Sequence, residues 1–225
     1  MPGLPRLLNQ LEAHYGAQHA VSPTDPYLFL IWWHCGYPAS DAACMKGWDS
    51  LQRTVGLEPK KILAAPLPTL TAALRPGGMV PDVRALRLKE VAESFQSLRR
   101  RRGEIGRAML KTLPGIADAG ADRILLFANI SPIAAVPSNA PQVAVRMLRG
   151  KESDNYGRNY SESQKLTAAE IPEDFAARQR AYLLLKQHGQ EICKRTSPKC
   201  SACPIVKACA FATSSQPENW PGPAR

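Results

Sequence analysis

Four cysteines stand within seventeen residues near the end of the chain, in the segment CKRTSPKCSACPIVKAC from Cys193 to Cys209. Their spacing is C-x6-C-x2-C-x5-C. In a reducing compartment such a group is more typical of a metal or redox site than of a disulfide framework. Four thiolates can bind Zn²⁺ or an iron–sulfur cluster. Zinc ribbons and fingers usually carry two C-x2-C pairs, so the single pair between unequal spacers favours a cluster and leaves zinc as the alternative.

The charge balance indicates a polyanionic partner. The 225 residues carry a formal net charge of +10 and give a pI near 9.5. Nucleic acid is the first candidate for such a partner, and a basic surface without a partner is the alternative. The N-terminal sequence lacks the basic-then-apolar order of a signal peptide, and the chain has no long apolar run. We therefore expect a cytoplasmic protein with no membrane span, in which Cys35 and Cys44 are small core residues.

A second segment with chemical potential is LKTLPGIADAGADRILLFA, from Leu110 to Ala128. Pro114 and Gly115 predict a tight turn between two short helices. The N–H groups at the start of the following helix have no helical partner and can bind an anion. An ordinary αα-hairpin without a ligand is the alternative. The basic run Arg99–Arg102 either complements a helix C-terminus or contacts phosphates.

Both segments resemble the same family. HGQEICKRTSPKCSACPIVKACAFA and the LPG hairpin are similar to endonuclease III and its relatives, which are DNA glycosylases of the helix-hairpin-helix superfamily. The resemblance implies a [4Fe–4S] cluster and a basic loop that meets the DNA backbone. The implied cluster ligands are Cys193, Cys200, Cys203 and Cys209. The implied DNA-binding residues are Leu113, Gly115, Ala117 and Ala119 in the hairpin and Lys194, Arg195, Lys199 and Lys207 in the loop. Ala117 departs from the family pattern, which usually has a second glycine there.

The positions that carry chemistry in the family are apolar in this sequence. By resemblance, the Schiff-base lysine aligns with Ala119, the catalytic aspartate with Pro137, and the glutamate of the adenine-excising branch with Trp33. None of these side chains can stabilise an oxocarbenium ion, transfer a proton or attack a sugar. We therefore expect no residue to fill the usual catalytic roles, and weak or absent glycosylase and AP lyase activity.

Four other residues are weak substitutes for the missing groups: Asp118, Asp122, Asp41 and Lys111. We expect Asp118 to cap a helix, Asp122 to lie on the surface and Asp41 to be structural. The loop around His34, Tyr37 and Pro38 takes the place where relatives insert a wedge residue into the duplex, although a loop that only packs is the alternative. Trp32 and Trp33 line a base pocket or belong to the core, and we expect a filled or altered pocket.

Helical periodicity dominates the chain, so the predicted class is all-α, with the two-lobed glycosylase fold that the resemblance implies. One lobe is a six-helix barrel over residues 22–131. The other joins residues 1–21 to 132–212, with the cluster loop at 193–209 and a disordered tail at 213–225. The segment GKESDNYGRNYSES, residues 150–163, is predicted to be a polar loop. The last long helix is expected over Pro172 to Gln187.

These observations together predict a monomeric, nucleoid-associated protein that binds duplex DNA, damaged or abasic sites included. Two alternatives remain: an active N-glycosylase with rewired catalytic residues, and a zinc-stabilised structural helical domain.

Overall fold

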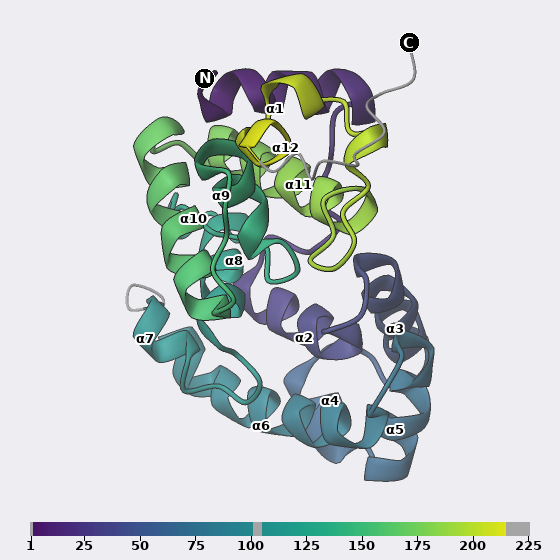
Figure 1. Cartoon of the computed structure of the whole chain (residues 1–225). Helices are drawn as coiled ribbons and strands as arrows, with labels where there is room; N and C mark the ends of the chain where they lie inside the picture. The colour runs from purple at the N-terminus through teal and green to yellow at the C-terminus, as the bar shows by residue number, and fades with distance from the viewer. Residues whose placement is uncertain (1, 101–104, 215–225) are drawn as a thin grey trace. The chain divides into compact units, whose positions relative to one another are not determined.

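The computed structural model describes residues 2–100 and 105–214, the side chains of 95–100 excepted. Helices and connecting loops make up this described part, which contains no strand, so the predicted all-α class is confirmed (Figure 1). The chain divides into two compact units. One comprises Val21–Ile130, and the other comprises Met1–Ala20 together with Ser131–Arg225.

The Val21–Ile130 unit is built around a helix that is apolar on every side. Tyr27 and the run Phe29–Gly36 in this helix, α2, are buried, which is typical of a central helix in an α-helical domain. Asp25 caps its start by accepting a hydrogen bond from the N–H of Leu28 at 3.0 Å. The helical elements of this unit are α2 (Pro26–Gly36), α3 (Asp41–Thr54), α4 (Pro59–Ala64), α5 (Leu67–Leu74), η1 (Arg75–Gly77), α6 (Pro81–Arg100), α7 (Arg107–Leu110) and α8 (Asp118–Phe127).

A buried arginine joins three of these elements. Arg84 of α6 is 1% exposed. Its Nε donates to the carbonyl of Met79, and its Nη2 donates to the carbonyls of Leu74 and Gly78 at 3.0 and 2.7 Å. Its Nη1 donates to the carbonyl of Cys35 at the end of α2. Orphan carbonyls at helix ends need donors when they are buried, and this one guanidinium supplies them.

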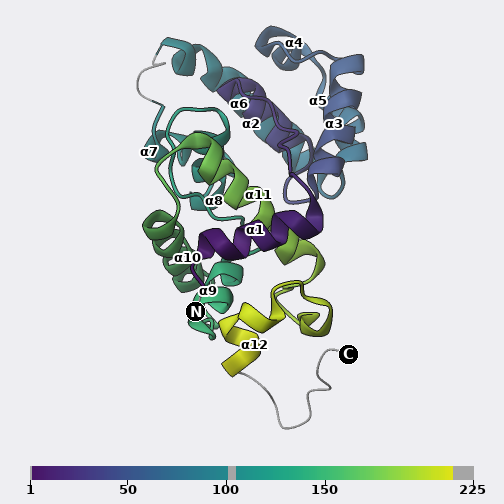
Figure 2. The ribbon, with the colours of Figure 1, turned by 90° about the horizontal axis from the view of Figure 1, so that it is seen from above.

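The second unit packs its first helix against helices from the far end of the sequence. Leucines at four positions of α1 are buried with residues of α9, α11 and the cysteine loop, and α1 lies beside α11 (Figure 1). Figure 2 shows α9 and α12 side by side. The elements of this unit are α1 (Leu4–Tyr15), α9 (Pro141–Arg149), α10 (Tyr156–Glu170), α11 (Phe175–Glu191), η3 (Cys200–Ala202), η4 (Val206–Ala208) and α12 (Ala210–Ser214).

The helix α10 corrects the sequence-based prediction, because residues 150–163 were expected to form a polar loop. The loop ends at Asn155, whose side chain caps α10 by accepting from the N–H of Arg158 at 3.0 Å. The buried face of α10 includes Asn159 and Ser163. A helix that buries polar side chains shows little apolar periodicity, which is why the pattern did not indicate it.

The last long helix begins at Phe175 and not at Pro172, since Asp174 provides its N-cap. The expected tail was wrong at its first two residues, since Thr213 and Ser214 belong to the helix Ala210–Ser214. Residues 215–225 of that tail, and the side chains of the basic run Arg99–Arg102, lie outside the described residues. Within the part of the chain that the structure describes, no helix has the length and apolar character needed to cross a membrane.

Candidate cysteine site and nucleic-acid interface

The four cysteines of the C-terminal segment line one small cavity. Cys193, Cys200, Cys203 and Cys209 all face it, together with apolar side chains such as Met147. All four are free thiols, so the segment is not a disulfide framework. Among the described residues, no three Cys, His, Asp or Glu side chains meet closely enough to hold a single metal ion.

Arg146 of α9 holds the start of this cysteine loop. Its side chain is 4% exposed. Its Nη1 donates to the carbonyl of Lys194 at 2.7 Å and lies 3.7 Å from the Cys193 sulfur, while its Nη2 donates to the carbonyl of Arg195 at 3.0 Å. Nη2 also pairs with the carboxylate of Glu152. The guanidinium thus fixes the loop backbone and places a positive charge beside the first cysteine.

Two further side chains attach the loop to the helices. Gln142, one turn before Arg146, donates to the carbonyl of Cys193 at 3.1 Å. His188 of α11 lies with Nε2 3.7 Å from the Cys203 sulfur and with Nδ1 3.0 Å from the Tyr15 hydroxyl. Gln142 and His188 are each 1% exposed, so the loop is anchored from inside the unit.

Burial governs the charge of the thiols. It raises the pKa of Cys203 to about 12 and that of Cys193 to about 11, although Arg146 beside Cys193 opposes the second shift. Burial therefore favours the neutral thiol at both positions. The basic side chains of the same loop behave differently, since all are exposed to solvent and none has an acidic partner among the described residues: Lys194, Arg195, Lys199 and Lys207.

The hairpin predicted from the LPG segment is present as α7, a turn and α8. Gly115 adopts a φ of +70° in the turn. Within the described residues, no hydrogen bond takes the backbone N–H of Gly115, Ala117 or Ala119. Gly115 and Ala117 are exposed, whereas Leu113 is buried below the turn. The turn therefore offers free donors to an anion, as the sequence predicted.

We predict that Gly115→Ala weakens duplex binding several-fold and lowers the free energy of unfolding by about 1–2 kcal/mol, because an L residue is strained at this φ. Its β-carbon would also lie 2.9 Å from Nη1 of Arg87. Gly16→Ala is the matched control, since Gly16 has a φ of +75° and no neighbour within 4 Å. Urea unfolding measures the stability of both variants, and fluorescence anisotropy measures their duplex binding. If the hairpin did not contact DNA, the two variants would show equal losses of binding.

The acidic residues near the hairpin are held by cations. Asp122 is completely buried and receives Nε and Nη2 of Arg107 at 2.7 and 3.0 Å, so the expected surface position was wrong. Asp118 pairs with Nζ of Lys111 at 2.6 Å, which lowers its pKa. The N-cap of α8 is Ala117, so the predicted capping role of Asp118 was also wrong. Ion pairs across the turn thus determine the environment of both Asp118 and Asp122.

Asp41 has the structural role that we expected. Its carboxylate pairs with Nη2 of Arg123 at 2.9 Å, and the Arg123 side chain is 5% exposed. The Arg123 guanidinium also lies over the ring of Trp32, 5.0 Å from its centroid. Cys35 and Cys44 are buried in the same unit, which confirms them as core residues.

Trp33 fills the space beside the start of α8. It is 3% exposed, and a β-carbon on Gly120 would lie 3.1 Å from its Cζ2 atom. The ring of Tyr37 stacks on Trp33 with centroids 3.6 Å apart. His34 is buried, and Pro38 is the exposed member of the expected wedge loop. Of the three wedge candidates, His34 and Tyr37 thus pack against the unit and Pro38 is exposed.

We predict that His34 makes the protein less stable in acid. Burial, assisted by Arg87 and Arg84, lowers its pKa to about 3, and its Nε2 has no hydrogen-bond partner among the described residues. The unfolded chain protonates this histidine near its ordinary pKa, so its contribution to stability is lost as the pH falls below about 6.5.

The expected loss from His34 is about 2 kcal/mol between pH 7.5 and 5. Urea unfolding of the wild type and of His34→Leu across this range measures it. In the variant, the free energy of unfolding should fall by about 2 kcal/mol less over this pH range. Identical pH profiles for the two proteins would contradict the prediction.

Comparison with known structures defines the class of this fold. A trapped endonuclease III–DNA covalent intermediate matches with a TM-score of 0.74 and 20% identity, covering 95% of this chain and 99% of that chain. A thermostable thymine-DNA glycosylase matches with a TM-score of 0.71 and 20% identity, covering 94% and 97%. The chain therefore has the endonuclease III fold, and the fold that the resemblance implied is confirmed.

Among curated proteins, a thymine/uracil-DNA glycosylase of Pyrobaculum aerophilum is 29% identical over 156 residues. This match covers 68% of the chain and 66% of the relative. No protein-family model matches the chain.

Sequence reasoning missed the residues that organise the two segments. Arg146 and Gln142 hold the cysteine loop, and Arg107 clamps the acids of the hairpin. A signal for Arg146 exists in retrospect, because it lies on the buried face of α9 between Val143 and Met147. A charged residue in an apolar stripe indicates a buried partner, but the sequence does not say which one.

Proposed function

We propose that the protein binds duplex DNA as an endonuclease III-like member of the base-excision-repair glycosylases, with weak or no N-glycosylase and AP lyase activity. The observation that carries this proposal is the contrast between two sets of residues. The loop cations are exposed and have no acidic partner in the described chain, and the hairpin N–H groups have no hydrogen-bond acceptor there, whereas the nearby carboxylates are held by cations. Such a surface can bind a phosphate backbone but offers no ready group for chemistry.

We further propose that Cys193, Cys200, Cys203 and Cys209 hold a [4Fe–4S] cluster. Support comes from the cavity that all four line and from their spacing in the sequence, where one C-x2-C pair lies between longer spacers. A four-iron cube separates its ligands more widely than a zinc ion does. When bound, the cluster supplies a cross-link between four points of the loop. Arg146 and Gln142 hold the loop backbone, so the cations between the cysteines face solvent in a fixed arrangement.

The proposed lack of chemistry rests on positions 119, 137 and 33, which the family resemblance aligns with the catalytic residues. Ala119 in α8 has no nucleophile, and Pro137 is a buried residue before α9. Trp33 occupies space beside α8 with an apolar ring. A cytoplasmic location with the nucleoid, as a monomer, is part of the same proposal.

An activity panel tests the proposal. Duplexes with uracil, a thymine mispair, an oxidised pyrimidine or an abasic site would be incubated with the protein and trapped with borohydride, with binding measured at two salt concentrations. We expect salt-dependent binding to all duplexes, little excision and no covalent adduct. Robust strand cleavage or a trapped adduct would contradict the proposed lack of activity, and absence of binding would contradict the DNA-binding role.

A second candidate is an active DNA N-glycosylase, and the similarity to the thymine/uracil-DNA glycosylase favours it. Its chemistry would need a substitute carboxylate, and Asp118 and Asp122 lie nearest the hairpin turn. Asp118→Asn or Asp122→Asn should abolish excision in that case. Asp118→Asn is the cleaner variant, since Asp118 is half exposed while Asp122 is buried against Arg107. The zinc-stabilised domain would instead be colourless, contain one zinc and lack DNA affinity.

A further inference from the structure

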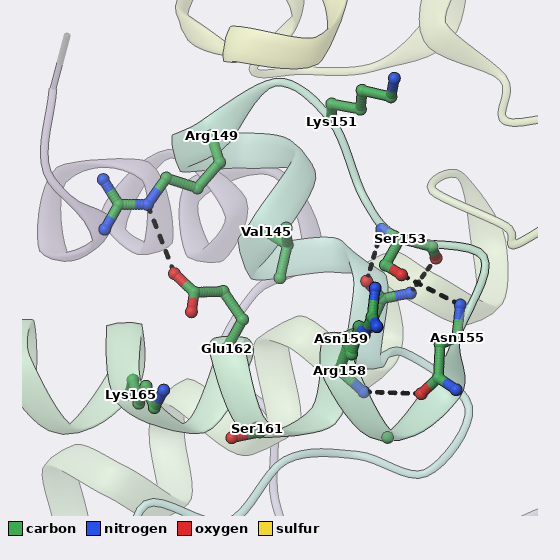
Figure 3. A pocket seen from close by; sticks show the side chains of 11 residues that line it. Val145, Arg149, Lys151, Ser153, Asn155, Arg158, Asn159, Ser161, Glu162 and Lys165 are labelled. Atoms are coloured by element: carbon green, nitrogen blue, oxygen red, sulfur yellow. Dashed lines mark hydrogen bonds and ion pairs between the residues drawn. The ribbon is translucent and has the colours of Figure 1, made fainter.

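A large polar pocket lies in the second unit, apart from the cysteine loop and its cations. It has a volume of about 600 Å³. The C-terminal half of α9 forms one side, α10 forms another, and the connecting loop from residue 151 to 155 closes the end (Figure 3). The helix α10 on this pocket is the one that the sequence pattern did not predict. The proposed DNA-binding surface of the hairpin and the cysteine loop does not include this pocket.

The lining of this pocket is strongly basic. Four cationic side chains stand against one acid, Glu162, which leaves three positive charges. Nε of Arg149 pairs with Glu162 at 3.5 Å (Figure 3). The other three cations are exposed and have no acidic partner within the described part of the chain: Lys151, Arg158 and Lys165. Like charges gathered on one surface repel each other, so an anionic ligand would relieve this repulsion.

The loop at the end of the pocket is fixed by its own hydrogen bonds. The Asn159 side chain accepts from the N–H of Ser153 at 2.8 Å and donates to its carbonyl at 2.7 Å. The Ser153 hydroxyl accepts from the N–H of Asn155 at 3.1 Å (Figure 3). Glu152, the acid next to Ser153, pairs with the buried Arg146 and does not line the pocket. The pocket wall is thus ordered, and one acid is withdrawn from it.

We propose that this pocket binds phosphate groups of a nucleic-acid strand, as a third backbone contact in addition to the hairpin and the cysteine loop. This inference rests on the proposed DNA-binding function. The chemistry is phosphate recognition, because arginine and lysine bind its oxygens and neutral amides and hydroxyls complete the lining. The cations are spread over α9, the loop and α10 and are open to solvent. Such a layout suits an extended strand better than a small enclosed anion.

The double variant Arg158→Gln/Lys165→Gln tests the inference. Both residues are exposed on α10, and glutamine supports a helix as well as arginine or lysine does. Each lost phosphate contact reduces the salt slope of the binding constant by about 0.9. We therefore expect the slope for a short duplex to fall by about 1–2, with several-fold weaker binding for every base sequence.

Two comparison variants separate the possible causes of a change. Arg6→Gln/Lys60→Gln removes the same charge from exposed sites outside the pocket and should change the slope by less than about 0.5. Lys194→Gln/Lys199→Gln removes cations of the cysteine loop and reports on the proposed function itself. Circular dichroism and thermal unfolding confirm that each variant is folded.

Each outcome decides between the two proposals. A wild type that binds no duplex overturns the proposed function and this inference together. If the cysteine-loop variant loses slope while the pocket variant matches the Arg6/Lys60 control, the proposed function stands and this inference fails. Inorganic phosphate and ADP are the small-anion probes. Binding of either that depends on Arg158 and Lys165, with an unchanged duplex slope, would show a small-ligand site and overturn the strand assignment.

Discussion

Replacing Arg146 by methionine is expected to lower the free energy of unfolding of the second unit by about 3 kcal/mol or more and to release the cysteine loop. The change leaves the carbonyls of Lys194 and Arg195 without their donor and the carboxylate of Glu152 without its partner. Methionine retains much of the apolar stem, so the loss reports on polar contacts and not on volume.

Urea unfolding measures the stability, and iron and sulfide per chain measure whether the loop still binds the proposed cluster. Arg146→Lys should fall between wild type and Arg146→Met, because lysine keeps the charge but cannot donate to several carbonyls at once. Arg149→Met is the matched control on the same helix, since Arg149 is 60% exposed. It should change stability by no more than about 0.5 kcal/mol. Equal losses at 146 and 149 would show that the loop does not depend on Arg146.

The second large effect is expected at position 137. Pro137→Asp should raise excision by at least about 100-fold on one or more duplexes of the activity panel, because a carboxylate beside the sugar stabilises a developing oxocarbenium ion. The backbone around this residue favours the experiment. The carbonyl of Pro137 accepts from the N–H of Ala140 at 2.9 Å, and this bond needs no proline ring. Single-turnover excision is the measurement.

Pro137→Asn is the control, since it has the shape of aspartate without the charge. It should leave excision at the wild-type level. If Pro137→Asp binds duplex normally and remains inactive, the missing carboxylate is not what limits the protein. Adding Ala119→Lys to Pro137→Asp should introduce a borohydride-trappable adduct, because the lysine can then attack the sugar as a nucleophile.

The two segments that defined the site could be predicted from sequence because each is short and local. The cysteines from 193 to 209 line one cavity because a loop of seventeen residues can bring its own side chains together. The turn at Gly115 follows from local backbone preferences, and its positive φ agrees with them. The all-α class followed in the same way from periodicity in the apolar residues.

The burial and the ion-pair partners of the acidic and basic side chains could not be predicted in this way. From the sequence, Asp122 is expected on the surface of a helix. It is buried because Arg107, fifteen positions earlier, pairs with its carboxylate across the turn. Helix α10 was missed because its buried face includes polar residues such as Asn159, which bonds to the preceding loop. The pocket beside it therefore had no sequence signature.

The sequence by itself thus determined which residues gather at the cysteine loop and the hairpin turn, since chain connectivity places them together. Tertiary structure alone decided which charges are neutralised and which stay open to a ligand. Arg146 reaches carbonyls forty-eight and forty-nine positions away, and Lys165 has no acidic partner in the described chain. The physical reason is that the neutralisation of a charge depends on its neighbours in space, and packing brings these neighbours together from distant parts of the chain.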